Sequence, residues 1–364
     1  MPVASQGTVK ALIPEELKEI GVTIILGNTY HLYLRPGINV IEKLGGLHRF
    51  MAWDGPILND SGGYQVFSLA RLCRLTDDGV TFRSHIDGSE HHLTPELVID
   101  LQQKLGADII MTLDECPAVD AGMVKIREAV DRTSRWAERC RRHYLGSDQL
   151  LFGIVQGGTL SQLRQQSAKA ITSLDFHGYA IGGLSLGEAK DLTWSMVDET
   201  IPFLPSDKPR YLMGVGSPED IVEGVDKGID LFDSALPTRV ARNGALFTMK
   251  GRVNIRKAVY KTKKVPIDAG CDCYTCRTFS AAYLCHLFKC EELLAYRLAT
   301  IHNLRFISRL IHHMHTTIRQ DNFAEFKNEF LSQYQVTDEQ VRLAQKRKWL
   351  STPIYGDNIS KKVR

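Results

Sequence analysis

Three aspartates each come directly after a short apolar segment, where a carboxylate can act as a nucleophile or as an acid–base group. They are Asp60, Asp114 and Asp233. Barrels of parallel strands present their catalytic groups at the carboxyl ends of the strands. A single Phe-Asp pair is a weak motif, and Asp233 taken alone would more simply cap a loop. The three positions together predict an acidic site.

Two arginines lie shortly after the last of these aspartates. Arg239 and Arg242 precede the turn residues Asn243 and Gly244. Guanidinium groups hold phosphates through paired hydrogen bonds. The net charge of the chain is only +3, so any site for a polyanion has to be a local patch.

A cysteine cluster predicts a metal site. Cys271, Cys273 and Cys276 place three thiolates around one turn, close enough for one tetrahedral ion. Structural zinc sites are closed by four ligands, commonly three cysteines and a histidine. We expect His302 as the fourth ligand and a structural rather than a catalytic zinc. The competing fourth ligands are Cys285, His286 and Cys290.

The elements that carry these residues follow a repeating pattern. Apolar segments without alternation predict strands buried on both faces, as in a parallel sheet. These segments are 22–26, 56–59, 108–113, 150–155, 179–181, 210–213 and 229–232. Segments with helical periodicity separate most of them. These are 93–105, 123–143, 161–174, 189–200 and 218–227.

With a strand fragment at 1–3, the count and the alternation predict an α/β fold, a (β/α)8 TIM barrel, over residues 1–245. The fragment would represent only part of the first barrel strand. The alternative is a doubly wound open sheet, which usually carries a Gly-x-Gly-x-x-Gly turn that this chain lacks. Residues 246–364 predict a zinc-binding, helical C-terminal subdomain. Its expected helices are 280–298, 304–321 and 323–334.

The composition fits a globular protein without a membrane segment. The chain has 364 residues, of which 43% are hydrophobic and 24% charged. No run of about 18 apolar residues predicts a membrane span, and the N-terminus does not read as a signal peptide. Eight cysteines without a secretion signal predict a reducing compartment, and we expect a cytoplasmic location.

The chain resembles the tRNA-guanine transglycosylases, and the bacterial type more closely. The matching stretches are Ile-Leu-Gly-Asn-Thr-Tyr-His at 25–31, Asp-Ser-Gly-Gly-Tyr-Gln-Val-Phe at 60–67, Leu-Asp-Glu-Cys at 113–116, Phe-Gly-Ile-Val-Gln-Gly-Gly at 152–158, Ile-Gly-Gly-Leu-Ser-Leu-Gly-Glu at 181–188, Tyr-Leu-Met-Gly-Val-Gly at 211–216, Phe-Asp-Ser-Ala-Leu-Pro-Thr-Arg at 232–239 and Thr-Ile-His-Asn at 300–303. Together with the cysteine cluster they occur in family order over nearly the whole chain.

The resemblance implies an enzyme of queuosine biosynthesis. Such enzymes exchange the wobble guanine in the anticodons of tRNAs for Asp, Asn, His and Tyr for a 7-deazaguanine base. The implied tRNA carries this guanine in a U-G-U context. Asp233 would be the nucleophile that attacks C1′ and holds the tRNA covalently, as in retaining glycosyl transfer. Asp60 would be the acid–base group for the departing and arriving bases.

The resemblance also implies how the base is recognised. Asp114 would accept hydrogen bonds from nitrogens of the base, while Gln156 and the backbone of Gly183 and Leu184 would meet its carbonyl edge. The two remaining positions, Tyr64 and Met213, would sandwich its faces, although both could instead pack in the barrel core. Arg239 and Arg242 would bind the anticodon loop, since sequence-specific RNA recognition usually takes place on single-stranded loops.

Three features refine these expectations. Family members usually begin with a short additional segment before the position of Met1. Leu186 beside Cys116 predicts that preQ1, the smaller base, is favoured over the alternative base queuine. The spacing of Phe279, Tyr283 and His286 puts them on one helix face. They match an aromatic cluster of bacterial homodimers, with Phe50 of the second subunit as a contact, although this face could simply pack on the barrel.

Two other functions compete with base exchange. A non-catalytic tRNA-binding subunit would lack the nucleophile, whereas Asp60, Asp114 and Asp233 are all present. A zinc-dependent barrel hydrolase would need several histidines among the strand-end residues, and only His31 lies there. Base exchange on tRNA is therefore the function that the sequence favours.

Overall fold

The computed structural model describes residues 1–69, 73–146 and 148–344. The chain divides into two compact units. The first unit comprises residues 1–26, 51–55 and 214–337. The second comprises residues 27–50, 56–213 and the described residues from 338 onward. The predicted boundary between residues 245 and 246 is a separate question and stays a prediction.

The core of the second unit is a row of parallel strands in chain order. The strands are β2 (Ile57–Asp60), β6 (Ile109–Met111), β7 (Leu150–Val155), β8 (Gly178–Ile181) and β9 (Arg210–Leu212). Each is hydrogen-bonded in parallel to the next along the chain. Almost every residue of these strands is buried, which explains their uninterrupted apolar sequences. A doubly wound sheet would reverse its strand order, and these strands do not, so the predicted barrel class is confirmed.

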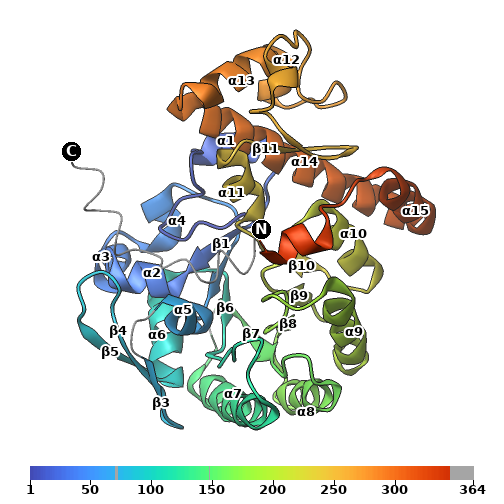
Figure 1. Cartoon of the computed structure of the whole chain (residues 1–364). Helices are drawn as coiled ribbons and strands as arrows, with labels where there is room; N and C mark the ends of the chain where they lie inside the picture. The colour runs from blue at the N-terminus through green and yellow to red at the C-terminus, as the bar shows by residue number, and fades with distance from the viewer. Residues whose placement is uncertain (70–72, 147, 345–364) are drawn as a thin grey trace. The chain divides into compact units, whose positions relative to one another are not determined.

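Helices connect these strands and lie outside them (Figure 1). They are α6 (Pro95–Leu105), α7 (Met123–His143), α8 (Ser161–Thr172) and α9 (Lys190–Thr200), which continues into the short η1 (Ile201–Phe203). Helix α6 illustrates how the sequence sets its limits. The Thr94 side chain accepts a hydrogen bond from the Leu97 amide, and Gly106 ends the helix with a left-handed φ of 70°. All the helices that the sequence predicts between these strands are present, with small shifts at their ends.

Several elements of this region were not predicted. The short helices α2 (Thr29–Leu34), α3 (Ile38–Lys43), α4 (Gly46–Met51) and α5 (Gly63–Leu69) follow the first two strand segments. A small antiparallel sheet of β3 (Cys73–Leu75), β4 (Val80–Arg83) and β5 (Glu90–Leu93) comes next. Arg139 of α7 holds this sheet by donating to the backbone oxygens of Asp77 and Asp78 and to the Glu96 carboxylate. Its strands have only three or four residues each and few of these residues are buried, so the sequence lacks the apolar run by which we identified strands.

In the first unit, the N-terminal residues take part in strand pairing. Pro2 forms a parallel bridge with Ser234, and Val3 forms one with Leu26. This confirms that residues 1–3 are strand-like. Strand β1 (Ile25–Asn28) begins later than the predicted segment 22–26, and β10 (Leu231–Phe232) is shorter than predicted. Helices α1 (Pro14–Ile20), α10 (Pro218–Asp226) and α11 (Leu236–Arg242) belong to the same unit.

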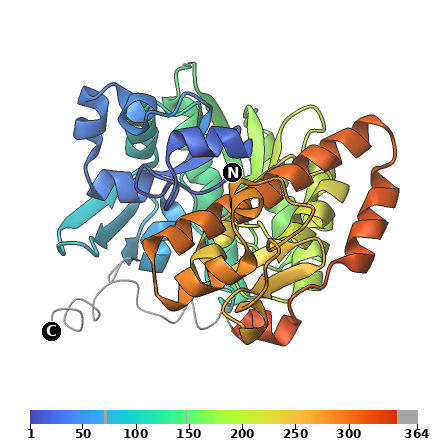
Figure 2. The same ribbon diagram turned by 90° about the horizontal axis from the view of Figure 1, so that it is seen from above.

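The C-terminal part of the first unit is mainly helical. It contains a hairpin of β11 (Ala245–Thr248) and β12 (Gly251–Asn254), then η2 (Ala258–Tyr260), α12 (Tyr274–Thr278), α13 (Ala281–Lys289), α14 (Leu293–Arg319) and α15 (Phe323–Gln333). Helices α13 and α14 bury Leu284, Phe288, Ala295 and Leu298 in one apolar cluster. Figure 2 shows α14 as one long rod, with α15 turning back from its end.

One predicted helix boundary in this region is wrong. We expected helices at 280–298 and 304–321, whereas the chain breaks at residues 290–292 and α14 then runs without interruption to Arg319. Glu291 adopts a left-handed φ of 56°, which ends α13. The polar residues His302 and Asn303, which lie between the two expected helices, are fully buried inside α14 and bind groups on other elements. None of the helices in the described ranges is both long and apolar enough to cross a membrane.

Candidate active site and metal centre

Asp60 ends β2 and its carboxylate is surrounded by hydrogen-bond donors. The side-chain amides of Asn28 and Gln65 donate to Oδ2 at 2.7 and 3.0 Å, and the Thr29 amide donates to Oδ1 at 3.3 Å. Only 7% of Asp60 is exposed. Donors in this number hold the carboxylate in one orientation. Asn28 and Gln65 were not predicted as site residues, although both lie inside quoted motifs.

Asp114 follows β6 and is buried. Its Oδ2 accepts a hydrogen bond from Gln156 Nε2 at 2.7 Å. Burial raises the pKa of Asp114 to about 6, against the opposing effect of hydrogen bonds from Gln156 and Ser61. Asp114 is therefore a carboxyl group that ionises close to neutral pH.

A glycine brings the segment after Asp60 against Asp114. A Cβ atom built on Gly63 would lie 2.6 Å from the backbone oxygen of Asp114 and 2.8 Å from its Oδ1. Ser61 also contributes a hydrogen bond to Asp114. The structure thus brings these two predicted site segments together, because residue 63 has no side chain that would separate them.

Gln156 joins Asp114 to the glycines that follow β8. Its backbone amide donates to Ser167 Oγ at 3.0 Å, which fixes the turn after β7. Its buried Oε1 has no hydrogen-bond partner among the described residues. A Cβ atom on Gly183, whose φ is 68°, would lie 2.2 Å from this oxygen. Gly183 and the buried Leu184 therefore lie beside a side-chain acceptor that a ligand N–H can use.

The other two predicted base contacts are half-buried. Tyr64 lies in α5, and Met213 follows β9, where its amide donates to the Ile181 oxygen at 3.2 Å. That bond places Met213 beside the strand that leads to Gly183. The predicted sandwich of a base between Tyr64 and Met213 stays a prediction.

Glu188 organises the loop after Gly183 and was missed by the sequence analysis. Its carboxylate accepts hydrogen bonds from the amides of Ser185, Leu186 and Gly187, and from Thr193 Oγ1 at 2.6 Å. The residue is 8% exposed. The predicted specificity residue Leu186 is thus held through its backbone.

Asp233 lies in the first unit, directly after β10. Its Oδ1 accepts a hydrogen bond from the Gly214 amide at 2.7 Å, and 9% of the residue is exposed. Gly214 is the residue after Met213 in the chain. The Gly216 Cα faces Ser234, since a Cβ atom there would lie 2.2 Å from the Ser234 Cβ. The backbone thus orients Asp233 at the end of its strand, as the sequence predicts.

The predicted RNA-binding arginines lie together on α11. Both are half-buried, and Arg242 donates to the Thr238 oxygen at 2.9 Å. Burial and the nearby charge of Arg239 lower the pKa of Arg242. Two cations held close together form a local positive region that can attract a phosphate.

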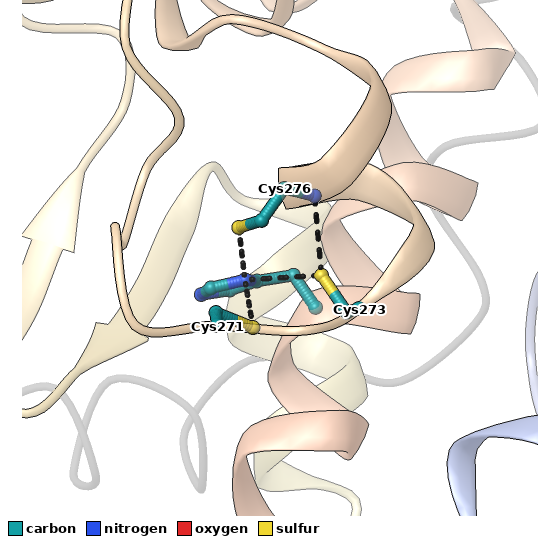
Figure 3. A group of neighbouring side chains, drawn as sticks. Cys271, Cys273 and Cys276 are labelled. Atoms are coloured by element: carbon teal, nitrogen blue, oxygen red, sulfur yellow. Dashed lines mark hydrogen bonds between the residues drawn. The ribbon is translucent and has the colours of Figure 1, made fainter.

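The predicted metal ligands converge. Figure 3 shows that the sulfur atoms of Cys271, Cys273 and Cys276 point toward one common centre. His302 Nδ1 lies 3.6 Å from the first two sulfurs and 3.3 Å from the third. The four ligand atoms all lie within 4.8 Å of one another, and all four residues are buried. A tetrahedral zinc bonded to sulfur and nitrogen separates them by about 3.5 Å, so the group fits a metal ion.

The surroundings of this cluster orient the histidine. His302 Nε2 lies 2.7 Å from the backbone oxygen of Phe247, so it carries the proton and leaves the Nδ1 lone pair for a metal. The competing ligands are placed elsewhere. Cys285 Sγ lies 4.0 Å from the Lys257 oxygen, and the exposed Cys290 contacts His286. His302 is therefore the fourth member of the cluster.

Asn303, the neighbour of His302, connects the cluster to α11. Its Oδ1 accepts from the Phe247 amide at 3.0 Å, and its Nδ2 donates to the oxygens of Pro237 and Ala245, both at 3.0 Å. Pro237 lies in α11, between Asp233 and Arg239. The buried side-chain amide of Asn303 thus links the metal cluster to the segment after Asp233.

Comparison with known proteins gives a consistent match. The family described as "Queuine tRNA-ribosyltransferase" matches residues 1–336. A protein of that name from Dehalococcoides mccartyi is 60% identical over 350 residues, which cover 96% of this chain and 89% of the relative.

Two further relatives carry the same name. The one from Caldanaerobacter subterraneus is 57% identical over 335 residues, covering 92% of this chain and 89% of the relative. The one from Desulforamulus reducens is 54% identical over 331 residues, covering 91% and 90%.

Proposed function

Because the chain belongs to the queuine tRNA-ribosyltransferase family, a family of pentosyltransferases, we propose that it exchanges the wobble guanine of tRNA anticodons for a 7-deazaguanine base. The observation that carries the proposal is the buried assembly of Asp60, Asp114 and Gln156, which offers ionisable and amide groups to the edge of a flat base. The exchange belongs to queuosine biosynthesis, and its substrates are tRNAs with a U-G-U anticodon context.

The chemistry is a double displacement. A carboxylate oxygen of Asp233 forms a bond to C1′ of the nucleotide, and the bond from C1′ to the base nitrogen breaks. The electron pair passes to the departing guanine, which takes a proton from Asp60. The incoming base returns its proton to Asp60 and displaces Asp233. The bond from the Gly214 amide supports this role, because it fixes one oxygen of the nucleophile.

Recognition of the base follows from the donors and acceptors of the second unit. Asp114 accepts from ring and exocyclic nitrogens, while Gln156 and the backbone of Gly183 and Leu184 meet the carbonyl edge. Tyr64 and Met213 stack on the faces. The unpartnered oxygen of Gln156 supports contact with a base that offers an N–H group, because a buried acceptor without a partner costs free energy until a donor fills it.

The base inserted is preQ1, with queuine as the alternative. Leu186 and the buried Cys116 restrict the space next to the base, and a larger substituent meets them first. Discrimination by apolar side chains amounts to about 10- to 200-fold, so a direct comparison of both bases settles the choice.

Arg239 and Arg242 bind the phosphates of the anticodon loop. Their shared position on α11 puts two positive charges within a few residues of Asp233. Salt dependence of tRNA affinity measures this contribution, because each phosphate contact releases counterions.

The metal is one structural zinc ion per subunit, held by Cys271, Cys273, Cys276 and His302. Three sulfur ligands and one imidazole match zinc, and the cluster is closed to a water ligand. The ion stabilises the fold around α12 and α14 rather than taking part in base exchange.

The C-terminal region from residue 246 is a zinc-binding subdomain that follows a catalytic barrel of residues 1–245.

The enzyme acts in the cytoplasm as a homodimer. The rings of Phe279 and Tyr283 stack with their centres 5.1 Å apart, and Tyr283 is 38% exposed, which supports an aromatic contact with a second copy. His286 and the second copy's Phe50 complete that contact.

A single reaction tests the proposal. Incubation with radiolabelled guanine and unmodified tRNA that carries a G-U-containing anticodon should place label in the RNA, and denaturation should leave a protein–RNA adduct. Asp233→Asn should abolish both signals. Asp230→Asn, which changes an exposed carboxylate on the same segment, serves as the matched control. Exchange that persists in Asp233→Asn would rule out the covalent route.

A further inference from the structure

Arg164 is a buried cation that the mechanism above does not use. It lies in the first turn of α8, and its relative exposure is 0%. Burial lowers its pKa to about 10. A guanidinium is costly to bury, and a positive charge near the N-terminus of a helix is unfavourable. Both costs indicate that the site gains something from this residue.

The hydrogen bonds of Arg164 go to backbone oxygens at the ends of two strands. Nε donates to Gly158 at 2.8 Å, and Nη1 donates to Val155 at 3.3 Å and to Gly182 at 2.8 Å. Val155 ends β7 and Gly182 follows β8. One side chain thus ties together the turn that carries Gln156 and the turn that carries Gly183.

The remaining nitrogen of Arg164 has no partner. Nη2 is buried and makes no hydrogen bond within the described residues. A Cβ atom on Gly183 would lie 3.6 Å from Nη2 and 2.2 Å from Gln156 Oε1. The unpaired nitrogen and the unpaired oxygen therefore lie beside the same glycine, whose amide meets the carbonyl edge in the proposed function.

No carboxylate neutralises Arg164 directly in the described ranges. Its hydrogen bonds are to carbonyl oxygens, and its electrostatic neighbours are Cys116 and Glu188. Burial raises the pKa of the Cys116 thiol, which is therefore neutral. Glu188 is engaged with the amides of its own loop. The guanidinium therefore lies behind the turns that carry Gln156 and Gly183 with no carboxylate in direct contact, and Glu188 acts on it only as a more distant charge.

We propose that Arg164 is a positioning residue for base exchange, which fixes these two turns and places a permanent positive charge behind the carbonyl edge of the base. This rests on the proposed function. When the bond between C1′ and the base nitrogen breaks, the electron pair enters the ring and shifts toward its carbonyl oxygen. Until Asp60 delivers its proton, a fixed charge in a water-poor site stabilises that negative charge.

Two variants separate the charge from the shape. Arg164→Met keeps an unbranched apolar chain like the stem of arginine and removes the charge and the donors, whereas Arg164→Lys keeps a charge. With radiolabelled guanine and tRNA, Arg164→Met should lower kcat by about 100-fold, with a change in KM for guanine of about 3-fold or less. Arg164→Lys should recover about 10-fold of that loss. Arg141→Met is the control, since Arg141 also donates to a backbone oxygen, that of Leu174.

A pH profile gives a readout that a structural role would not move. In the same buried site a lysine loses its proton at lower pH than an arginine does, because arginine has the higher intrinsic pKa. On the alkaline side, the kcat of Arg164→Lys should therefore fall at lower pH than the kcat of the wild type. The pH profile of Arg164→Lys tests the role of Arg164 even if Arg164→Met does not fold.

The outcomes are distinct. If wild type and Arg141→Met neither exchange guanine nor form the adduct, the proposed function fails. If they do both, but Arg164→Met retains wild-type kcat, or Arg164→Lys shows the wild-type alkaline profile, the role of Arg164 is overturned.

Discussion

At Asp114, burial and hydrogen bonding act in opposite directions, and burial dominates. The pKa of about 6 exceeds the ordinary value of 3.8. A carboxyl whose pKa is raised by folding favours the protonated native state, so its ionisation costs stability as pH rises from about 4 to about 6. At neutral pH the buried Asp114 carboxyl group therefore destabilises the second unit.

Asp114→Asn should therefore stabilise the protein above pH 7 by about 2–3 kcal/mol, because a pKa difference of this size has that linkage free energy. The gain should disappear near pH 4. Urea unfolding at both pH values measures it. Asp120→Asn, an exposed change on the same loop, should leave the unfolding free energy unchanged at both. Equal effects of the two substitutions would mean that burial of Asp114 has no linkage consequence.

Gly63 has no side chain, and this lets the segment after Asp60 approach Asp114 closely. Its φ is not left-handed, so Gly63→Ala tests only the 2.6 and 2.8 Å approach to Asp114. We expect about a 100-fold loss of guanine exchange, since a small displacement of a recognition group has effects of this size. Gly122→Ala is the control, because a Cβ atom there meets nothing within 4 Å. Guanine-exchange assays on both variants test this expectation. Equal activities would contradict the role of Gly63 in bringing Asp60 and Asp114 together.

At the scale of elements, the parallel strands could be predicted because each is buried on both faces and reads as an apolar run. The residues at their ends followed from that pattern, including Asp60, Asp114 and Gln156. The sheet β3–β5 could not be predicted, because its strands are short, few of its residues are buried, and its attachment is made by Arg139, far away in the sequence. Arg164 was missed for a related reason, since a charged residue in a helix gives no sign of its burial.

The helix break expected between residues 298 and 304 was wrong, because α14 runs through this segment without interruption. His302 and Asn303 are buried in α14, and their polar atoms are satisfied by β11 and α11. Sequence periodicity cannot distinguish such residues from a loop. The metal cluster, in contrast, could be predicted in full, because three closely spaced cysteines need a fourth ligand of limited choice.

The bonds of Asn303 predict a specific instability. Asn303→Ala should lower the unfolding free energy by about 2–4 kcal/mol, because it leaves the Phe247 amide and two backbone oxygens unpaired. Metal content should remain that of wild type. Asn322→Ala is the control, because the exposed Asn322 side chain makes no capping bond to α15. Chemical denaturation with metal analysis tests both, and loss of metal in Asn303→Ala would point instead to damage of the cluster.

For the whole molecule, the candidate metal ligands and the proposed base-reading residues belong to different compact units. The cluster, α11 and Asp233 belong to the first unit, while Asp114, Gln156 and Gly183 belong to the second. Structural zinc contributes on the order of 10 kcal/mol to the domain that it closes. The consequences of metal loss should therefore be greatest in the first unit.

Cys276→Ser should lose the metal, whereas Cys285→Ser, a buried change in the same unit outside the cluster, should retain it. Hydrogen exchange should show lost protection of α11, α12 and α14 in Cys276→Ser, since the bonds from His302 to Phe247 and from Asn303 to Pro237 depend on an ordered cluster. Protection of β7 and β8 should decrease much less. Equal loss of protection in all these elements would mean that the chain unfolds as one cooperative unit, and full protection would mean that the metal has no structural role.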